Sequence, residues 1–258
     1  MLNEQGLNNS DATTEGQTVD PKEVAFFAKI AESWWDPHGP FKPLHQLNPT
    51  RLAYIRQKII SHFGIDNSSK TPFDGLRLLD IGCGGGLISE PVCRLGADVV
   101  AVDAAAKNIS IASTHAVING LDIDFRNTTA EALAKAGELF DVIINMEVIE
   151  HVADVDAYLA ACRALLKPGG IMLLSTINRT PKAYLFAIIG AERVLRWLPR
   201  GAHDWNKFLT PAELSDASEK AGFIPSDATG FVFSPFSQKW RLSNSDFGVN
   251  YAMTAKGR

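Results

Sequence analysis

The chain has 258 residues, of which 46% are hydrophobic and 21% are charged, and its formal net charge is −4. This composition predicts one globular domain with additions, and the acidic balance argues against a nucleic-acid binder that relies on a broad basic surface. Three widely spaced cysteines without a C-x-x-C pair argue against a disulfide framework or a zinc site.

The amino-terminal residues 1–19 are polar, with neither a basic start nor an apolar segment. We expect them to form a disordered lead-in without a secretory signal, followed by a single domain over 20–258. The longest apolar run, 183–191, has less than half of the roughly twenty residues that a membrane-spanning helix needs.

The segment 20–70 is predicted to form a helical cap at the start of the domain. Asp20 is the expected N-cap of its first helix, with Pro21 at the first helical position and Glu23 as the partner in a capping box. A second helix is expected from Asn48. The stretch between the two helices is too rich in Pro and Gly to predict regular structure.

Short apolar runs then alternate with helical stretches. Buried strands are predicted at 76–81, 98–102, 140–145 and 170–176, a weaker strand at 121–125, and helices at 87–95, 105–119 and 154–166. This alternation predicts a parallel sheet covered on both faces. Further along, Thr210 and Glu213 predict a capped helix, and two β-like stretches at 223–233 and 249–256 predict an antiparallel pair at the sheet edge.

The turn "LLDIGCGGGL" at 78–87 follows the first predicted strand with the pattern Asp80, Gly82, Gly84, Gly86. A dinucleotide fingerprint needs G-x-G-x-x-G, which neither register provides, and no Gly-Lys-Ser/Thr follows for a phosphate-binding loop. The acid suits a cationic ammonium group, and the helix N-terminus beyond it suits a carboxylate. S-adenosylmethionine carries both charges and no phosphate.

A second acid, Asp103, ends the next predicted strand. A carboxylate at this position can accept hydrogen bonds from ribose hydroxyls in either a nicotinamide cofactor or S-adenosylmethionine. Only the glycine spacing and Asp80 separate the two cofactors, and they favour S-adenosylmethionine. An NAD oxidoreductase is therefore the weaker alternative.

Residues 70–180 resemble the class I S-adenosylmethionine-dependent methyltransferases, through "FDVIINMEVIEHV" and "LLKPGG" as well as the glycine turn. The flanking stretches "SWWDPHGPFKPLHQLNPTRLAYI", "GAHDWNKFLTPAEL" and "GVNYAM" are similar to the ubiquinone-biosynthesis O-methyltransferases, from about residue 20 to the end. The resemblance implies an α/β fold: a doubly wound, mostly parallel, seven-stranded Rossmann-like sheet with an antiparallel edge pair, N-terminal helices and a helical insert.

The same resemblance implies methylation of phenolic hydroxyls on polyprenylated precursors, from 3-demethylubiquinol to ubiquinol and from 2-polyprenyl-6-hydroxyphenol to the methoxyphenol. Two alternatives remain: another small-molecule methyltransferase, or a non-catalytic S-adenosylmethionine-binding scaffold of a lipid-synthesis complex.

Carried over from the family residue by residue, the cofactor contacts fall on Arg51, Gly82, Asp103 and Met146. The forked guanidinium of Arg51 suits the methionine carboxylate, and Met146 suits an apolar wall. The chain departs from the usual methyltransferase pattern at Thr128 and Thr129, where an acid often meets the adenine amine. Backbone groups around Ala130 and Glu131 are expected to take that role.

The loop "MEVIEHV" supplies the expected catalytic residues Glu147, Glu150 and His151. In a helical turn the three side chains would share one face. Two mechanisms then remain open. In one, the trio holds a divalent cation such as Mg²⁺, to which the acceptor oxygen binds and loses its proton. In the other, His151 acts alone as a general base.

Residues 178–209 form an expected amphipathic insert, and 178–207 carry six basic residues against two acidic ones. Arg193, Arg196 and Arg200 fall on one helical face. This pattern predicts peripheral contact with an anionic membrane, in which a polyprenyl substrate resides. We expect a cytoplasmic protein at the inner face of the membrane, partnered by the substrate and a ubiquinone-synthesis complex and not by nucleic acid.

Overall fold

A computed structural model describes residues 18–185, 204–234 and 237–257. The expected lead-in, 1–19, lies outside these ranges except for its last two residues, and for these the prediction of disorder is wrong. Thr18 is buried, Val19 forms an antiparallel bridge with Val152, and the Ala153 amide donates to the Thr18 carbonyl at 2.7 Å. Pairing to a distant loop orders these polar residues, and sequence periodicity cannot report such pairing.

The core of the structure is a nine-stranded sheet, as far as the described residues extend, in the order β3-β2-β1-β4-β5-β9-β7-β8, with β6 paired to β9. The parallel strands are β1 (Arg77–Ile81), β2 (Asp98–Asp103), β3 (Asp124–Asn127), β4 (Phe140–Met146) and β5 (Leu166–Ile177). The antiparallel strands are β6 (Phe223–Pro225), β7 (Thr229–Ser234), β8 (Lys239–Ser243) and β9 (Asn250–Gly257).

The predicted α/β class and doubly wound, mostly parallel sheet are confirmed, but the expected count of seven strands is wrong. The stretch predicted at 223–233 divides into β6 and β7, which pair with β9 separately. The sequence of β8, KWRLS, mixes charged and apolar residues and was not predicted as a strand. Strands β6, β7 and β8 are short and partly exposed, so their apolar signal is weak.

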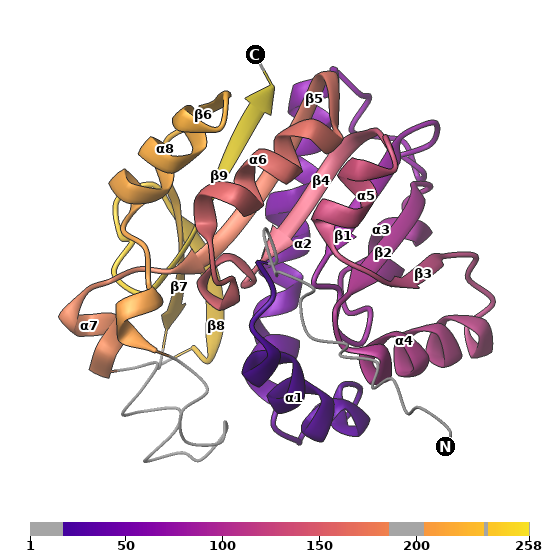
Figure 1. Cartoon of the computed structure of the whole chain (residues 1–258), viewed down its shortest axis with the longest axis horizontal. Coiled ribbons are helices and arrows are strands. Elements are labelled where there is room, and N and C mark those ends of the chain that lie inside the picture. The colour runs from indigo at the N-terminus through magenta and orange to yellow at the C-terminus, as the bar shows by residue number, and fades with distance from the viewer. Residues whose placement is uncertain (1–17, 186–203, 235–236, 258) are drawn as a thin grey trace, which may run out of the picture.

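Helices cover both faces of the sheet (Figure 1). They are α3 (Ser89–Arg94), α4 (Ala106–Ile118), α5 (Ala130–Lys135), α6 (Val155–Leu165), α7 (Pro181–Ala183) and α8 (Pro211–Lys220). One apolar cluster joins the sheet to α5, α6 and α8, and another joins it to α3 and to the N-terminal helix α2 (Lys42–Phe63). The predicted capping box of Thr210 and Glu213 is confirmed at the start of α8.

The N-terminal cap consists of α1 (Pro21–Ile30), a 3₁₀ turn (Ala31–Ser33) and α2 (Lys42–Phe63). Asp20 caps α1 as predicted, because its side chain accepts from the Lys22 amide at 2.9 Å. Glu23 does not complete a capping box and instead contacts His151.

Helix α2 begins before the predicted start at Asn48. Pro43 lies in its first turn, where the missing N–H has no helical partner to lose, and Pro49 is accommodated inside the helix. The prediction of irregular structure up to residue 47 is therefore wrong from Lys42 onward.

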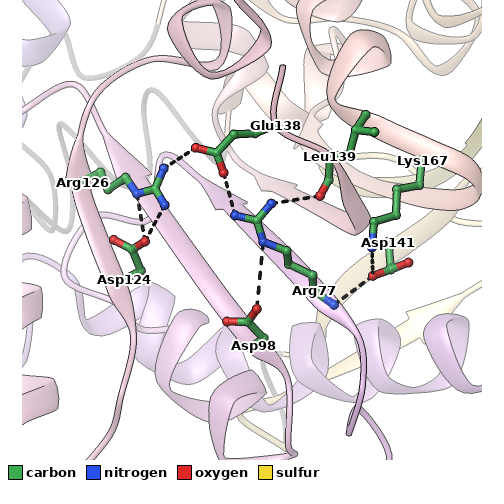
Figure 2. A network of polar contacts seen from close by, with 8 residues as sticks. All are labelled: Arg77, Asp98, Asp124, Arg126, Glu138, Leu139, Asp141 and Lys167. Carbon is green, nitrogen blue, oxygen red and sulfur yellow. Dashed lines mark hydrogen bonds and ion pairs between the residues drawn. The ribbon is translucent and has the colours of Figure 1, made fainter. Parts of the chain in front are cut away.

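The amino ends of the parallel strands are held by a network of ion pairs (Figure 2). Arg77 of β1 pairs with Glu138 at 2.6 Å, and Glu138 also pairs with Arg126 of β3. Lys167 of β5 pairs with Asp141 of β4 at 2.8 Å. This network joins neighbouring strands near their amino ends. The predicted site residues Asp80, Asp103 and Met146 lie at the opposite, carboxyl ends of the strands.

Residues 186–203, including Arg193, Arg196 and Arg200 of the expected insert, lie outside the described residues. At the border of this segment, Tyr184 and Leu185 are exposed apolar side chains. Within the described parts of the chain, no helix has the length and apolarity required to traverse a bilayer.

Candidate active site

A cavity of about 800 Å³ lies at the carboxyl ends of β1, β2 and β4, walled on the other side by α1 and the start of α2. Figure 1 shows α1 across this end of the sheet. Carboxyl ends at a point where strand order reverses, here between β1 and β4, are where such sheets bind ligands. The cavity gathers every predicted site residue: Arg51, Asp80, Gly82, Gly84, Asp103, Ala130, Met146, Glu147, Glu150 and His151.

The glycine turn is packed more tightly than its sequence indicates. Gly82 and Gly84 have φ of 69° and 55°, in the left-handed region that disfavours side chains. A Cβ at Gly82 would lie 2.4 Å from Val148, and one at Gly84 would lie 2.4 Å from the Trp34 ring. These two glycines are therefore required by neighbouring protein side chains, and both also line the cavity.

The amides of this turn are already engaged. The Gly82 and Cys83 amides donate to the Val102 carbonyl at 2.8 and 3.0 Å, and the Gly84 amide donates to Asp103 at 3.0 Å. The sequence predicted that amides beyond the turn would meet a ligand carboxylate. These three donors lie within the turn and are used inside the protein, so they do not test the predicted contact at the helix N-terminus beyond it.

Asp103 is held firmly at the end of β2. Besides the Gly84 amide, its carboxylate accepts from the Ala105 amide at 2.8 Å and the Asn108 side chain at 3.2 Å. Burial raises the pKa of Asp103, and these hydrogen bonds oppose the rise. Oδ1 accepts from both Ala105 and Asn108, whereas Oδ2 accepts only from Gly84, so Oδ2 keeps a lone pair that can accept from a ligand hydroxyl.

Asp80 lies deeper, at 3% exposure, and accepts a hydrogen bond from the Ser89 hydroxyl at 2.5 Å. Burial raises the pKa of Asp80 to about 7, against the opposing effect of that hydrogen bond. The carboxylate is therefore close to half-ionised at neutral pH, and a neighbouring cation would favour its ionised form.

Arg51 of α2 provides the buried positive charge. Its side chain is 5% exposed, and Nη2 lies 3.4 Å from Glu147 Oε1. Nε and Nη2 nevertheless make no hydrogen bond among the described residues. Buried guanidinium donors are ordinarily satisfied, so idle donors on a cavity wall fit a carboxylate ligand.

The three residues predicted to share one helical face do not do so, and this prediction is wrong. Glu147 has a φ of 60°, which breaks the expected turn, and only Ile149–His151 form a 3₁₀ turn. In the ranges that the structure describes, no three His, Cys, Asp or Glu side chains are grouped so that they could hold a metal ion. The trio therefore does not fit the expected cation.

Each member of the trio has its own partners. Glu147 accepts from Ser175 at 3.1 Å and from Asn250 at 3.2 Å, in addition to its ion pair with Arg51. Glu150 is buried and accepts from the Thr176 hydroxyl at 2.8 Å. His151 Nδ1 lies 3.1 Å from Glu23 Oε2. Local sequence spacing could not predict partners that come from four different elements.

The ionisation of Glu150 and His151 reflects their burial. Burial, and then the charge of Glu147, raise the pKa of Glu150 to about 7. Burial alone would lower the pKa of His151, but the hydrogen bond that its ring donates to Glu23 and the charges of Glu150, Glu23 and Glu147 outweigh it and raise that pKa above its ordinary value. The loop thus holds two groups whose pKa values are both raised above their ordinary values.

Trp34 is a cavity residue that the sequence interpretation missed. Its ring stacks on Phe41 with centroids 3.7 Å apart, and its indole N–H donates to Asn108 at 2.9 Å. Asn108 in turn holds Asp103. The adjacent Trp35 donates to the Gly85 carbonyl at 2.9 Å. Paired tryptophans at the end of a short helix were the available signal, since both rings require buried contacts.

Thr129 is used within the protein at the position where related folds often place an acid. Its hydroxyl accepts from the Ala132 amide at 3.3 Å and caps α5, while Ala130 is buried on the cavity wall. The N-terminal Thr18 donates to Glu131 of the same helix.

Comparison with known proteins gives concordant results. A family model described as "Methyltransferase domain" matches residues 51–224. The ubiquinone biosynthesis O-methyltransferase of Cereibacter sphaeroides (strain ATCC 17029 / ATH 2.4.9) is 61% identical over 93% of this chain and 98% of that protein. Its namesake in Ruegeria pomeroyi is 61% identical over 91% and 94%.

Among solved structures, magnesium protoporphyrin IX methyltransferase from Synechocystis PCC 6803 with bound SAH superimposes with a TM-score of 0.65 at 18% identity, over 92% of this chain and 98% of that chain. This likeness concerns the fold. Together, the fold, the cavity and the domain match define an S-adenosylmethionine-dependent methyltransferase. The chain belongs to the ubiquinone biosynthesis O-methyltransferase family.

Proposed function

We propose that the protein methylates phenolic hydroxyls of polyprenylated ubiquinone precursors, converting 3-demethylubiquinol to ubiquinol and 2-polyprenyl-6-hydroxyphenol to the methoxyphenol. The substrate class follows from the family. The observation that carries the chemistry is that the idle donors of Arg51, the acids Asp80 and Asp103, and the imidazole of His151 line one cavity.

In this proposal the cavity binds S-adenosylmethionine by its two charges. Arg51 receives the carboxylate, Asp80 the ammonium and Asp103 the ribose hydroxyls. When bound, the sulfonium supplies an activated methyl group. Contacts with the rest of the cofactor fall on Gly82, Gly84, Ala130 and Met146, all of which line the cavity.

Cofactor affinity should depend on pH through Asp80. The ammonium selects the ionised carboxylate, and the pKa of that carboxylate is raised to about 7. Affinity for S-adenosylhomocysteine should therefore be full above pH 8 and fall roughly tenfold by pH 6, because one proton must leave for each ligand bound. Isothermal titration at several pH values measures this slope.

Asp80→Asn is the matched variant for that experiment. It keeps the shape of the side chain and removes its ionisation, so the affinity should be weaker and independent of pH between 6 and 8. The same pH slope in wild type and variant would show that another group is responsible.

The proposed acceptor chemistry assigns proton removal to His151. A phenol with a pKa of about 10 is mostly protonated at neutral pH and needs a base. The acceptor hydroxyl gives its proton to His151 while its oxygen forms the bond to the methyl carbon. The bond from that carbon to the sulfonium sulfur breaks, its electron pair stays on sulfur, and S-adenosylhomocysteine is the leaving group. The cavity aligns the two reactants and excludes water. Because the Glu147, Glu150 and His151 trio does not fit a cation, no step is assigned to a metal.

Methyl transfer from labelled S-adenosylmethionine to a short-chain demethylubiquinol, with and without chelator, tests the function. We expect label on the phenolic oxygen in both conditions. A protein that binds S-adenosylhomocysteine but transfers no label to any catechol would be a scaffold. Label on a different acceptor class alone would indicate another small-molecule methyltransferase, and loss of transfer with chelator would restore the metal mechanism.

We also propose peripheral contact with anionic membrane through 178–207, at the cytoplasmic inner face, within a ubiquinone-synthesis complex. The support is the basic excess of this segment, its border of exposed Tyr184 and Leu185, and the lipid solubility of a polyprenyl tail. Replacing Arg193, Arg196 and Arg200 with Glu should reduce co-sedimentation with anionic liposomes. Equal sedimentation of variant and wild type would reject the electrostatic contact.

A further inference from the structure

The N-terminal helix α1 reaches the imidazole of His151 with two side chains. Glu23 Oε2 lies 3.1 Å from Nδ1, and the ring of Phe27 packs edge-on against the imidazole with centroids 5.3 Å apart at 89°. The two α1 residues are one helical turn apart and so share a face. The carboxylate and the imidazole are both largely shielded, with side-chain exposures of 21% and 15%.

Lys207 holds the same carboxylate from the far side. Its Nζ lies 3.6 Å from Glu23 Oε1 and 3.1 Å from the N-cap Asp20. Hydrogen bonding from His151 lowers the pKa of Glu23, with further lowering by the charges of His151 and Lys207. The Glu23 carboxylate is therefore ionised at neutral pH, and its two oxygens contact Lys207 and His151.

Helix α1 has no fully buried residue of its own. It is held by Phe27 and Ile30, which are partly buried against the apolar cluster around Trp34, by the polar contacts of Glu23, and by the bridge between Val19 and Val152 that precedes it. The contact with His151 joins residues far apart in the sequence. When α1 docks on the rest of the domain, its Glu23 and Phe27 therefore also orient the imidazole of His151.

We infer that Glu23 is a positioning residue for methyl transfer, which holds His151 with its proton on Nδ1 and its basic lone pair on Nε2. This inference rests on the proposed function, in which His151 receives the phenolic proton. An ionised carboxylate on Nδ1 fixes the tautomer and stabilises the imidazolium formed during the reaction. The N-terminal cap thereby becomes part of the acid–base apparatus as well as a wall of the cavity.

Among the described residues, the charged groups that act on this imidazole include Glu23 from α1 and Glu147 and Glu150 from its own loop, and Lys207 faces Glu23. Glu23→Gln keeps the size of the side chain and removes the charge on Nδ1. It should lower kcat about 10- to 100-fold. This is less than the full rate acceleration of roughly 10²- to 10⁴-fold that a positioned base contributes, because His151 itself remains. The KM for the quinol and the affinity for S-adenosylhomocysteine should stay within about twofold.

Glu32→Gln is the matched control. Glu32 lies in the same N-terminal segment, its side chain is 81% exposed, and it pairs with Lys107 at 2.8 Å, away from His151. Its kcat should equal that of wild type. Histidine ¹⁵N resonances, assigned with a His151→Ala sample, give a second readout. The His151 signal should report a proton on Nδ1 in wild type and a shift toward the other tautomer in Glu23→Gln.

A Glu23→Gln protein with wild-type kcat and an unchanged His151 signal would overturn the positioning role even if methyl transfer proceeds normally. If wild type transfers no methyl at all, the proposed function fails, and the ¹⁵N signal still decides the role of Glu23. Should Glu23→Gln fail to fold, Lys207→Met loosens the same carboxylate. It should lower kcat in the same direction, and an unchanged kcat with an unchanged signal would contradict the inference.

Discussion

Replacing His151 with alanine should lower kcat about 10²- to 10⁴-fold while affinity for S-adenosylhomocysteine stays within about twofold. The imidazole lines the cavity, and burial is outweighed by Glu23, Glu150 and Glu147 so that its pKa is raised. A base of this kind accelerates removal of the phenolic proton and contributes little to cofactor binding. Steady-state kinetics and calorimetric titration of one preparation measure both quantities.

The raised pKa of His151 adds a pH signature to that result. Because only the neutral imidazole accepts a proton, kcat of wild type should rise with pH through a value above the ordinary 6.5 of histidine. His62→Ala is the control, because His62 bonds the Gly169 carbonyl and does not line the cavity. Normal turnover in His151→Ala combined with a large loss of cofactor affinity would contradict the role of a base.

Replacing Arg51 with alanine should weaken binding of S-adenosylhomocysteine about 10- to 150-fold. The lost interaction is a charge-assisted contact with the carboxylate, worth about 1.5–3 kcal/mol. Arg51→Lys keeps the positive charge but loses the forked guanidinium, so its affinity for S-adenosylhomocysteine should lie between those of wild type and Arg51→Ala. Calorimetric titration gives the values, and thermal unfolding should also show a loss because Glu147 is left without its ion pair.

Arg56→Ala is the matched control, since Arg56 lies on the same helix and bonds the Asn67 carbonyl at 2.8 Å, away from the cavity. Its affinity should match that of wild type. Equal affinities for Arg51→Ala and wild type would mean that the carboxylate is held elsewhere, for instance by amides of the glycine turn that rearrange on binding.

Local patterns in the sequence predicted what lies along one strand or helix. Asp80 and Asp103 end adjacent parallel strands, so their predicted meeting in one site required only the alternation of strands and helices. The capping box at Thr210 likewise depends on residues within one turn of α8. The α/β class and the grouping of these two acids in one cavity could be predicted for this reason.

Tertiary contacts accounted for the rest. The turn at Glu147 takes a left-handed φ, which the apolar periodicity of its loop does not reveal. Glu23 was assigned to a local cap, but the distant His151 is its partner. Trp34 packs on Gly84 because the N-terminal cap folds back over the sheet. Each of these depends on segments brought together only by folding, where tertiary context overrides local preference.

The decisive experiment is a crystal structure of the protein with S-adenosylhomocysteine. We expect the carboxylate on the guanidinium of Arg51, the ammonium at Asp80, the ribose hydroxyls on Asp103, and the imidazole of His151 on the acceptor side of the sulfur. A ligand found outside this cavity, or bound there while Arg51 contacts only Glu147, would contradict it.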